Sequence, residues 1–349
     1  MYESFYGLAG KPFQLNPDPA FFFGSRGHKR AFAYLQYGLY QSEGFIVITG
    51  DIGAGKTTIV RSLFEQLDRA KVVAAQLVST QLDADDMLRA VATAFGLNVR
   101  TADKASLLSS LEAFLCQVAV DRKRALLVVD EAQNLTPRAV EELRMLSNFQ
   151  LGEQALLQSF LIGQPELRTM LQSAHMEQLR QRVIASFHLG PLDKAETAAY
   201  IEHRLNHVGW KGDPQFDAAC FELIHTLTDG IPRRINTLCN RLLLAGFLGE
   251  RHLLGVADVQ AIAGEIRDEM GPNTTLSNAP PVTDAVDAGP ATKGGTAPVR
   301  LDSAAVRTQL KRIEERLDRL DKSVATAVEL LGKLQPADQA SSPDTAEGR

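Results

Sequence analysis

Residues 50–57 read Gly-Asp-Ile-Gly-Ala-Gly-Lys-Thr and fit the pattern G-x-x-x-x-G-K-[ST], which constrains both the fold and the chemistry of the chain. The preceding run, 45–49, is Phe-Ile-Val-Ile-Thr, which is typical of a buried strand, and residues 58–67 carry apolar side chains at helical spacing. Glycines let a backbone turn so that its N–H groups point at anionic oxygens, and the next helix adds its positive end. The pattern therefore predicts a strand, loop and helix that bind a polyphosphate.

The polar residues of this loop have distinct expected roles. Lys56 would place its charge beside the β and γ phosphates, and Thr57 would offer a hydroxyl to Mg²⁺. The residues expected to contact the nucleotide here are Gly50, Asp51, Ile52, Gly53, Ala54, Gly55, Lys56, Thr57 and Thr58.

A second apolar run, Leu126–Val129, ends in two acids, Asp130 and Glu131. Taken alone, such a pair is a solvated strand end. Behind a strand that follows a phosphate-binding loop, however, an acid is well placed to hold Mg²⁺ through water. We therefore predict that Asp130 helps to bind the metal and that Glu131 polarises an attacking water.

Two further residues are expected to sense the phosphates. Gln164 follows the apolar run 156–162 and could contact the γ-phosphate or the water, although a turn residue or helix cap would look the same. Arg233 lies in the run 230–236, Gly-Ile-Pro-Arg-Arg-Ile-Asn, which opens a helix. From there it could reach the nucleotide, so that the position of its domain would depend on the phosphate state.

Arg180 and Arg182 precede the last expected strand, where an arginine could enter the site of a neighbouring subunit. We select Arg182 as a catalytic candidate, with the choice between the two left open and a surface salt bridge as the alternative. His203 and His207 lie four residues apart without a third metal ligand, so we interpret them as surface histidines.

The pattern of elements changes along the chain. Strand-like runs at 45–49, 72–78, 125–130, 156–162 and 183–188 alternate with helical patterns, which predicts a parallel α/β sheet. The predicted parts are an N-terminal segment 1–44, a nucleotide-binding domain 45–190, a helical lid 191–269, a flexible linker 270–299, a coiled-coil-like helix 300–335 and a disordered tail 336–349. The expected lid helices are 193–208, 214–229, 232–248 and 256–269.

The overall composition indicates which kinds of partner and which cellular compartment to expect. The net charge of −5 gives no global basic footprint for nucleic acid. The three cysteines lack C-x-x-C spacing, which favours reduced thiols in the cytoplasm. No signal peptide or run of about 18 apolar residues is visible in the sequence, so we expect no transmembrane segment and a cytoplasmic protein.

Several motifs together resemble a known family. They are Tyr6-Gly7-Leu8, Lys11-Pro12-Phe13, Asn16-Pro17-Asp18-Pro19, Asp130–Leu135 (DEAQNL) and Gly163–Leu167 (GQPEL). With the phosphate-binding loop, Gln164 and Arg233, they are similar to AAA+ ATPases of the general secretion pathway protein A group. The branch that they resemble most is encoded beside exosortase (PEP-CTERM) and exopolysaccharide loci.

This resemblance implies a 5-1-4-3-2 parallel sheet with a helical lid, ATP with Mg²⁺ as ligands, and assembly into a ring or arc. It also implies that Phe13, Phe23 and His28 lie near the adenine. Family members often continue into a membrane span and a periplasmic domain, whereas this chain continues into a linker and heptads. Many AAA+ proteins carry Asn or Thr where this chain has Gln164, which bears on hydrolysis rate.

The resulting expectation is ATP hydrolysis, coupled to rearrangement of the lid and oligomer, that drives or regulates an envelope or exopolysaccharide secretion system. The helix 300–335 would contact membrane-associated export or polysaccharide-assembly proteins, and so associate the protein with the inner membrane. Two alternatives stay open. One is a DNA-associated ATPase of the transposition-helper kind, which steep salt dependence of DNA binding would reveal. The other is a nucleotide-switched scaffold with little turnover.

Overall fold

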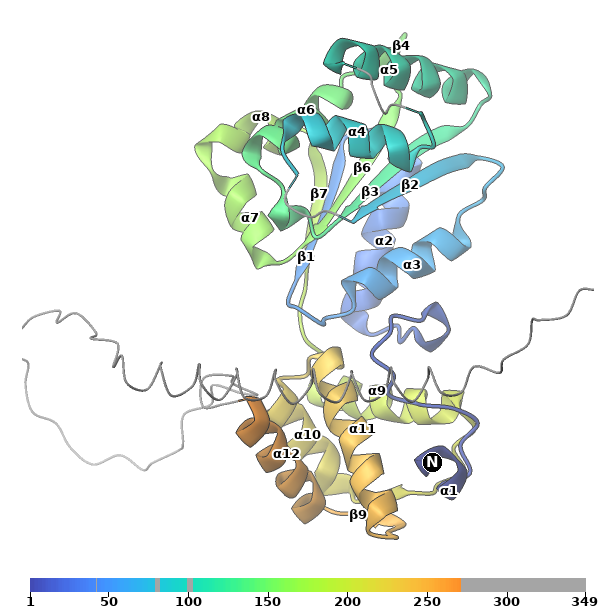
Figure 1. Ribbon diagram of the computed structural model, residues 1–349, viewed down its shortest axis with the longest axis vertical. Helices are drawn as coiled ribbons and strands as arrows, with labels where there is room; N and C mark the ends of the chain where they lie inside the picture. The colour runs from blue at the N-terminus through green and yellow to red at the C-terminus, as the bar shows by residue number, and fades with distance from the viewer. Residues whose placement is uncertain (42, 79–81, 99–102, 271–349) are drawn as a thin grey trace, which may run out of the picture. The chain divides into compact units, whose positions relative to one another are not determined.

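A five-stranded parallel sheet is the frame of the nucleotide-binding half of the chain (Figure 1). Its strands are β1 (Phe45–Gly50), β2 (Val72–Val78), β3 (Arg124–Asp130), β6 (Leu157–Gly163) and β7 (Val183–Leu189). They lie in the spatial order β2-β3-β6-β1-β7, with every neighbouring pair parallel. Numbered along the chain and read from β7, this order is 5-1-4-3-2, so the expected sheet is confirmed.

The structure is a computed structural model that describes residues 1–41, 43–78, 82–98 and 103–270, all within one compact unit. The expected linker after Met270, the heptad helix 300–335 and the tail 336–349 lie outside the described residues. Among the helices that are described, none combines the length and the apolar character needed to cross a membrane.

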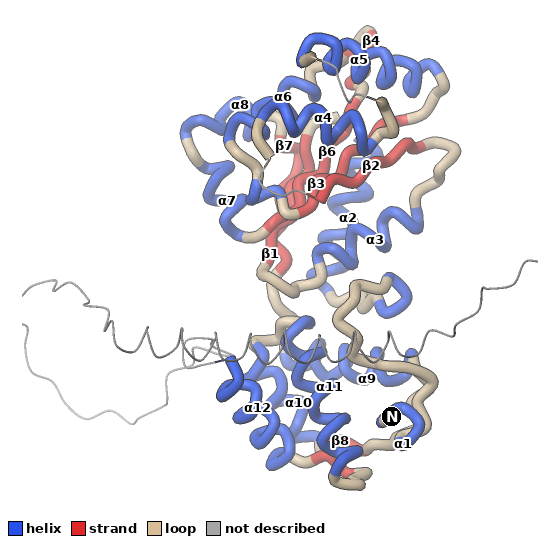
Figure 2. The backbone as a smooth tube through the Cα atoms, viewed as in Figure 1, coloured by secondary structure: helices blue, strands red, loops and turns tan. Residues whose placement is uncertain are grey.

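Helices cover both faces of the sheet, because the strand side chains alternate between two apolar cores (Figure 2). In β1, Ile46 and Ile48 belong to one core, and Phe45 and Val47 to the other. The first face packs against α2 (Arg26–Gln41) and α3 (Lys56–Gln66). The second packs against α4 (Ala84–Ala94), α5 (Lys104–Val120), α6 (Pro137–Leu146), α7 (Pro165–Gln172) and α8 (Glu177–Arg180).

Local capping explains where several of these helices begin. Asp83 accepts a hydrogen bond from the N–H of Asp86 at the start of α4, and Thr136 accepts one from Ala139 before Pro137 opens α6. Helix α6 ends at Leu146. The chain turns there into the hairpin of β4 (Gln150–Leu151) and β5 (Gln154–Ala155).

The lid contains α9 (Lys194–His207), α10 (Ala218–Thr228), α11 (Pro232–Leu248) and α12 (Val256–Met270), which share one apolar core. The sequence predicted helices only in this region, but β8 (Gln215–Phe216) and β9 (Leu253–Leu254) form a short parallel pair. Because that pair uses residues 215–216 and Asp217 caps the next turn, α10 begins at Ala218 rather than at 214.

The predicted segment 1–44 divides between the two halves of the unit. Residues 1–13, with α1 (Tyr2–Phe5), pack into the lid core through Tyr2, Tyr6, Leu8 and Phe13, whereas α2 packs on the sheet. Burial drives this split, because these large apolar side chains are at most 7% exposed against the lid helices. Only the connection between them, which we call the strap (residues 14–23), and His28 of α2 reach the site described below.

Candidate nucleotide-binding site

The phosphate-binding loop joins β1 to α3 and folds around the side chain of Lys56. The Lys56 Nζ donates hydrogen bonds to the carbonyl oxygens of Gly50 at 2.7 Å and Asp51 at 2.9 Å. Burial lowers the pKa of Lys56, while the charges of Glu131 and Asp130 oppose that change. The ammonium group is therefore held inside the loop, beside two acids.

His28 supports the loop from α2. Its Nε2 lies 3.0 Å from the carbonyl oxygen of Ala54, and its Nδ1 lies 2.7 Å from the hydroxyl of Ser25. A carbonyl only accepts, so Nε2 carries the proton and Nδ1 accepts from the hydroxyl. The ring packs so closely that a Cβ at Gly55 would lie 2.6 Å from Nε2, and Gly55 has φ +99°. Burial lowers the pKa of His28, which favours this neutral form.

Thr57 and Asp130 supply the oxygens suited to a magnesium ion. The Thr57 hydroxyl donates to Asp130 Oδ2 at 3.1 Å, and Asp130 is 3% exposed. Burial raises the pKa of Asp130, against hydrogen bonds from the Glu131 N–H and Thr57 that lower it. Mg²⁺ prefers such hard oxygen ligands, so the donor set fits the ion that the sequence predicted.

Glu131 follows at the end of β3 and meets two glutamines. Its Oε2 accepts hydrogen bonds from Gln133 Nε2 at 2.6 Å and from Gln164 Nε2 at 3.1 Å. Partial burial acts to raise the pKa of Glu131, but these hydrogen bonds and the charge of Lys56 outweigh it and lower the pKa. The structure thus brings Gln164 to Glu131. Gln133 was missed by the sequence reasoning, although it stands two residues after Glu131.

The lid meets the loop at Arg233. The Arg233 N–H donates to the carbonyl oxygen of Gly53 at 3.2 Å, and a Cβ at Gly53 would lie 2.4 Å from the Arg233 Cβ. Arg234 instead forms an ion pair with Asp229 at 2.6 Å. The first turn of α11 is therefore in direct contact with the phosphate-binding loop.

The two candidate finger residues lie elsewhere. Arg182 donates to the Ser147 hydroxyl at 2.7 Å just before β7 begins, and Arg180 donates to the carbonyl oxygens of Leu171 and Ser173. Neither lines the cleft of this chain. A finger role for Arg182 concerns a second subunit and stays a prediction.

A cleft of about 210 Å³ joins these groups. Its lining includes Ile52, Gly53, Gly55, Lys56, Thr57, Thr58, Glu131, Gln164 and Arg233 from the predicted set, and Phe21, Phe22, Phe23, His28, Tyr200, Arg204 and Asn236 from other parts. The resemblance implied that Phe13 also lies near the adenine. The structure does not place it there, because Phe13 is 1% exposed in the lid core and does not line the cleft.

The strap lines the part of the cleft where the resemblance places the base, which we call the base end, and it alternates between the two cores. Phe22 packs with the sheet-side core, whereas Phe21 and Phe23 pack with the lid. The Phe21 ring centroid lies 4.2 Å from that of His207 and 4.7 Å from the Arg204 guanidinium. The Phe23 ring centroid lies 5.5 Å from that of His203. Both histidines therefore contact the strap.

Arg204 is a second residue that the sequence reasoning missed. It is 6% exposed and donates to the carbonyl oxygens of Pro12 at 2.5 Å and Gln14 at 3.2 Å, and to the Tyr200 hydroxyl at 3.0 Å. Its position in a regular amphipathic helix gave no signal, because its partners lie about 190 residues away along the chain.

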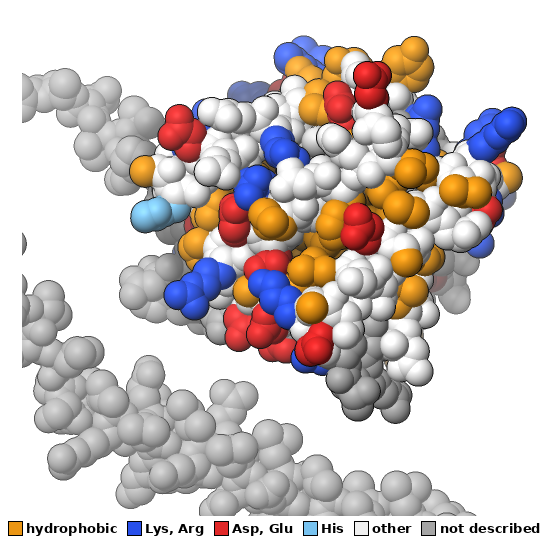
Figure 3. All heavy atoms as spheres, turned by 90° about the horizontal axis from the view of Figure 1, so that it is seen from above, with side chains coloured by type: hydrophobic (Ala, Val, Ile, Leu, Met, Phe, Trp, Pro, Cys, Tyr) orange, Lys and Arg blue, Asp and Glu red, His pale blue; other side chains and the backbone are white. Residues whose placement is uncertain are grey.

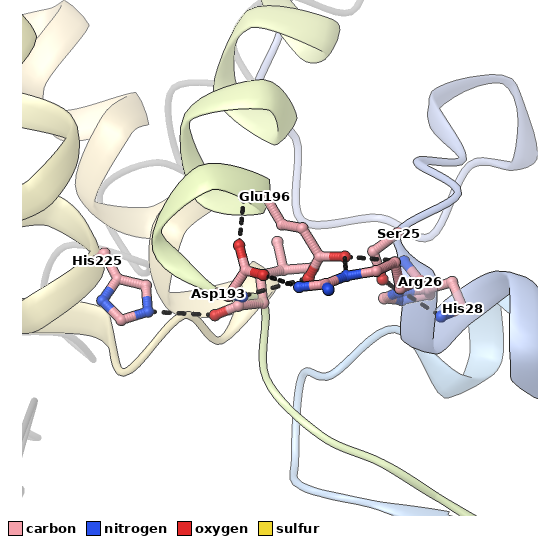
Figure 4. A network of polar contacts seen from close by, with 7 residues as sticks. Ser25, Arg26, His28, Asp193, Glu196 and His225 are labelled. Carbon is pink, nitrogen blue, oxygen red and sulfur yellow. Dashed lines mark hydrogen bonds and ion pairs between the residues drawn. The ribbon is translucent and has the colours of Figure 1, made fainter.

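A polar network ties the start of α2 to the start of α9 (Figure 4). Arg26 forms ion pairs with Asp193 and Glu196, the two members of the α9 capping box, and its N–H donates to Glu196 at 2.8 Å. His225 contacts the carbonyl oxygen of Leu192 at 3.2 Å on the other side. Since His28 stands two residues after Arg26, the start of α2 contacts both the start of α9 and the phosphate-binding loop.

Comparisons with known proteins show what the chain is related to. Residues 39–171 match the model of a family described as an AAA domain. General secretion pathway protein A of Aeromonas hydrophila is 39% identical over 274 residues, which is 77% of this chain and 50% of that protein. The chain belongs to the AAA proteins related to general secretion pathway protein A. It spans about half the length of that relative.

Several solved structures share the fold at low sequence identity. The ORC1 protein of Aeropyrum pernix, solved with DNA, matches with a TM-score of 0.55 at 18% identity, over 73% of this chain and 69% of that one. The ORC2 protein of the same organism matches with a TM-score of 0.53 at 18% identity, over 69% of this chain and 67% of that one. The Cdc6p protein of Pyrobaculum aerophilum matches with a TM-score of 0.52 at 16% identity, over 76% of this chain and 71% of that one. These likenesses support the fold.

Proposed function

We propose that this AAA protein hydrolyses ATP with Mg²⁺ and couples the reaction to movement of its lid. One observation carries the proposal: Lys56, Glu131 and Gln164, which follow strands of the sheet, border the same cleft as Arg233 from the lid. The nucleotide contacts assigned to residues 50–58 and to Asp130 belong to this proposal.

Each group has a part in that reaction. Lys56 would leave the carbonyl oxygens of its own loop and hold the β and γ phosphates. Glu131, kept ionised by its amide partners, would accept a hydrogen bond from the attacking water. Thr57 and Asp130 would hold Mg²⁺, which neutralises charge on the phosphates. Gln164 lies beside Glu131 and would orient the same water.

Lid movement follows from the contact between Arg233 and Gly53. A phosphate group seated in the loop would compete for space and charge where α11 touches it, so loop and lid would change together. Arg233 would then bind the γ-phosphate when it is present and release the lid when it is lost.

The test compares two variants with the wild-type chain. Lys56→Ala should weaken ATP binding, whereas Glu131→Gln should keep binding and lower phosphate release by about 100-fold or more. Unchanged turnover in Glu131→Gln would refute hydrolysis through this site. Binding of ATP that changes association state without turnover in the wild type would favour the switched scaffold instead.

We also propose that this activity serves an envelope or exopolysaccharide export system. The relation to general secretion pathway protein A supports a secretion role, and the resemblance to the exosortase-associated branch supports the narrower one. Export or polysaccharide-assembly proteins at the inner membrane would bind residues 300–335. A pull-down from native membranes, with and without ATP, should recover such proteins with the full chain and lose them after truncation at residue 270.

Assembly into a ring or arc is part of the same proposal. Arg182 of one subunit would act in the site of the next, so Arg182→Ala should lower turnover without weakening ATP binding. A DNA-associated role has less support. The net charge is −5, and on the face in Figure 3 Lys and Arg side chains are interleaved with Asp and Glu. Steep salt dependence of DNA binding, with stimulated turnover, would restore that alternative.

A further inference from the structure

Gln133 connects the two residues on which hydrolysis would depend. Its Nε2 donates to Glu131 Oε2 at 2.6 Å, and its Oε1 accepts the backbone N–H of Gln164 at 2.9 Å. The side chain of Gln164 donates to the same Glu131 oxygen at 3.1 Å. The end of β3 and the end of β6 are thus joined through one half-buried amide.

The chemistry of this position calls for a primary amide. A backbone N–H only donates and an ionised carboxylate only accepts, so the group between them must accept on one side and donate on the other. The same reasoning fixes which end of the Gln133 amide is oxygen. A glutamate at position 133 could accept the hydrogen bond from Gln164 but would place a second negative charge beside Glu131. A leucine could neither accept from Gln164 nor donate to Glu131.

The backbone around Gln133 is shaped to fit it. Glu131 has φ +54°, a left-handed conformation that costs a non-glycine residue of the order of 1 kcal/mol, and the short helix Ala132–Asn134 follows at once. Gly163 faces the amide, because a Cβ there would lie 2.7 Å from Gln133 Oε1. This turn brings Gln133 back over Glu131.

We propose that Gln133 is a positioning residue that fixes the Glu131 carboxylate against the Gln164 end of β6, so that one of its oxygens is free for the attacking water. Oε2 is taken by the two amides, and Oε1 accepts no hydrogen bond from the residues that the structure describes. The proposal rests on the proposed hydrolysis. It assigns to Gln133 an effect on catalysis and none on nucleotide binding, since Gln133 does not line the cleft.

Two variants separate the two hydrogen bonds. Gln133→Leu removes both, and Gln133→Glu keeps an acceptor for the Gln164 N–H but replaces the donor to Glu131 with a charge. Gln117→Leu is the matched control, because Gln117 donates to the Asp121 carboxylate at 2.9 Å on the exposed surface of α5. The measurements are kcat and KM for ATP across pH 5.5–9, binding of a non-hydrolysable ATP analogue, and hydrogen exchange of the Gln164 amide.

Both Gln133 variants should lower kcat by about tenfold or more, with analogue affinity changed less than about twofold. The backbone N–H of Gln164 should exchange with solvent faster in Gln133→Leu than in Gln133→Glu, because the glutamate keeps an acceptor for that N–H. The control should match the wild type throughout.

Other outcomes overturn the proposal. Wild-type kcat in Gln133→Leu, or a loss of kcat that tracks an equal loss of analogue affinity, would show that the amide does not position Glu131. Equal exchange of the Gln164 amide in the wild type and Gln133→Leu would remove the hydrogen bond on which the proposal stands. If the wild type and Glu131→Gln both lack turnover, the proposed hydrolysis fails. The exchange measurement alone then decides whether Gln133 holds the backbone N–H of Gln164.

Discussion

Substitution of Gly53 by alanine should separate the lid from the phosphate-binding loop. A Cβ at this position would lie 2.4 Å from the Arg233 Cβ, whereas carbon atoms in contact sit about 3.5–4.0 Å apart. The two backbones must therefore move apart by about 1 Å or more, which breaks the 3.2 Å hydrogen bond from the Arg233 N–H to the Gly53 carbonyl oxygen. The change should thus be visible at one amide.

The magnitude follows from that bond. A typical intramolecular hydrogen bond contributes about 0.5–1.5 kcal/mol, so the Arg233 amide should exchange with solvent roughly two- to twelvefold faster in Gly53→Ala. Gly96→Ala is the matched control. Gly96 has φ +84° against +85° at Gly53, so both variants carry similar backbone strain, but nothing lies within 4 Å of a Cβ at Gly96. If the Arg233 amide exchanges equally in the two variants, the lid does not depend on this contact.

Three further predictions concern the supports of the site. His28→Gln should keep a donor to the Ala54 carbonyl oxygen without a titrating ring. Because the fold lowers the pKa of His28 below its usual 6.5, the wild type should lose stability as pH falls below about 6.5, and the variant should lose less between pH 7.5 and 5.5 in urea unfolding. Phe13→Ala should cost about 3–5 kcal/mol in the same assay, against less than about 0.5 kcal/mol for Leu248→Ala, whose side chain is 73% exposed. Arg204→Met should leave the carbonyl oxygens of Pro12 and Gln14 unpaired and weaken ATP-analogue binding in calorimetry, whereas unchanged affinity would show that the strap does not order the base end of the cleft.

The sheet and the polyphosphate loop could be predicted from the sequence because their signals are local. The three central strands, β1, β3 and β6, are largely apolar and almost entirely buried, and the loop residues between β1 and α3 are adjacent in the chain. The placement of Asp130 and Gln164 followed for the same reason, since Asp130 ends β3 and Gln164 directly follows β6, its neighbour in the sheet.

The contacts that complete the cleft could not be predicted, because they depend on distant parts of the chain. Tyr2 donates to Asn240 across 238 residues, and thirteen residues are too few for a periodic pattern to reveal that the N-terminus belongs to the lid. Gln133 was hidden for another reason. Its role depends on the left-handed backbone conformation of Glu131, which could not be predicted because glutamate rarely adopts it.

The two ends of the cleft converge on one helix of the lid. At the phosphate end, Arg233 of α11 contacts Gly53. At the base end, Arg204 holds the strap and donates to the Tyr200 hydroxyl, which donates to Asn236 of α11 at 2.9 Å. Asn236 lies about one helical turn after Arg233, so base and phosphate contacts act on the same rigid element. The chain passes between sheet and lid both at the strap and before α9, so the lid movement that we propose would be a rotation about these two connections.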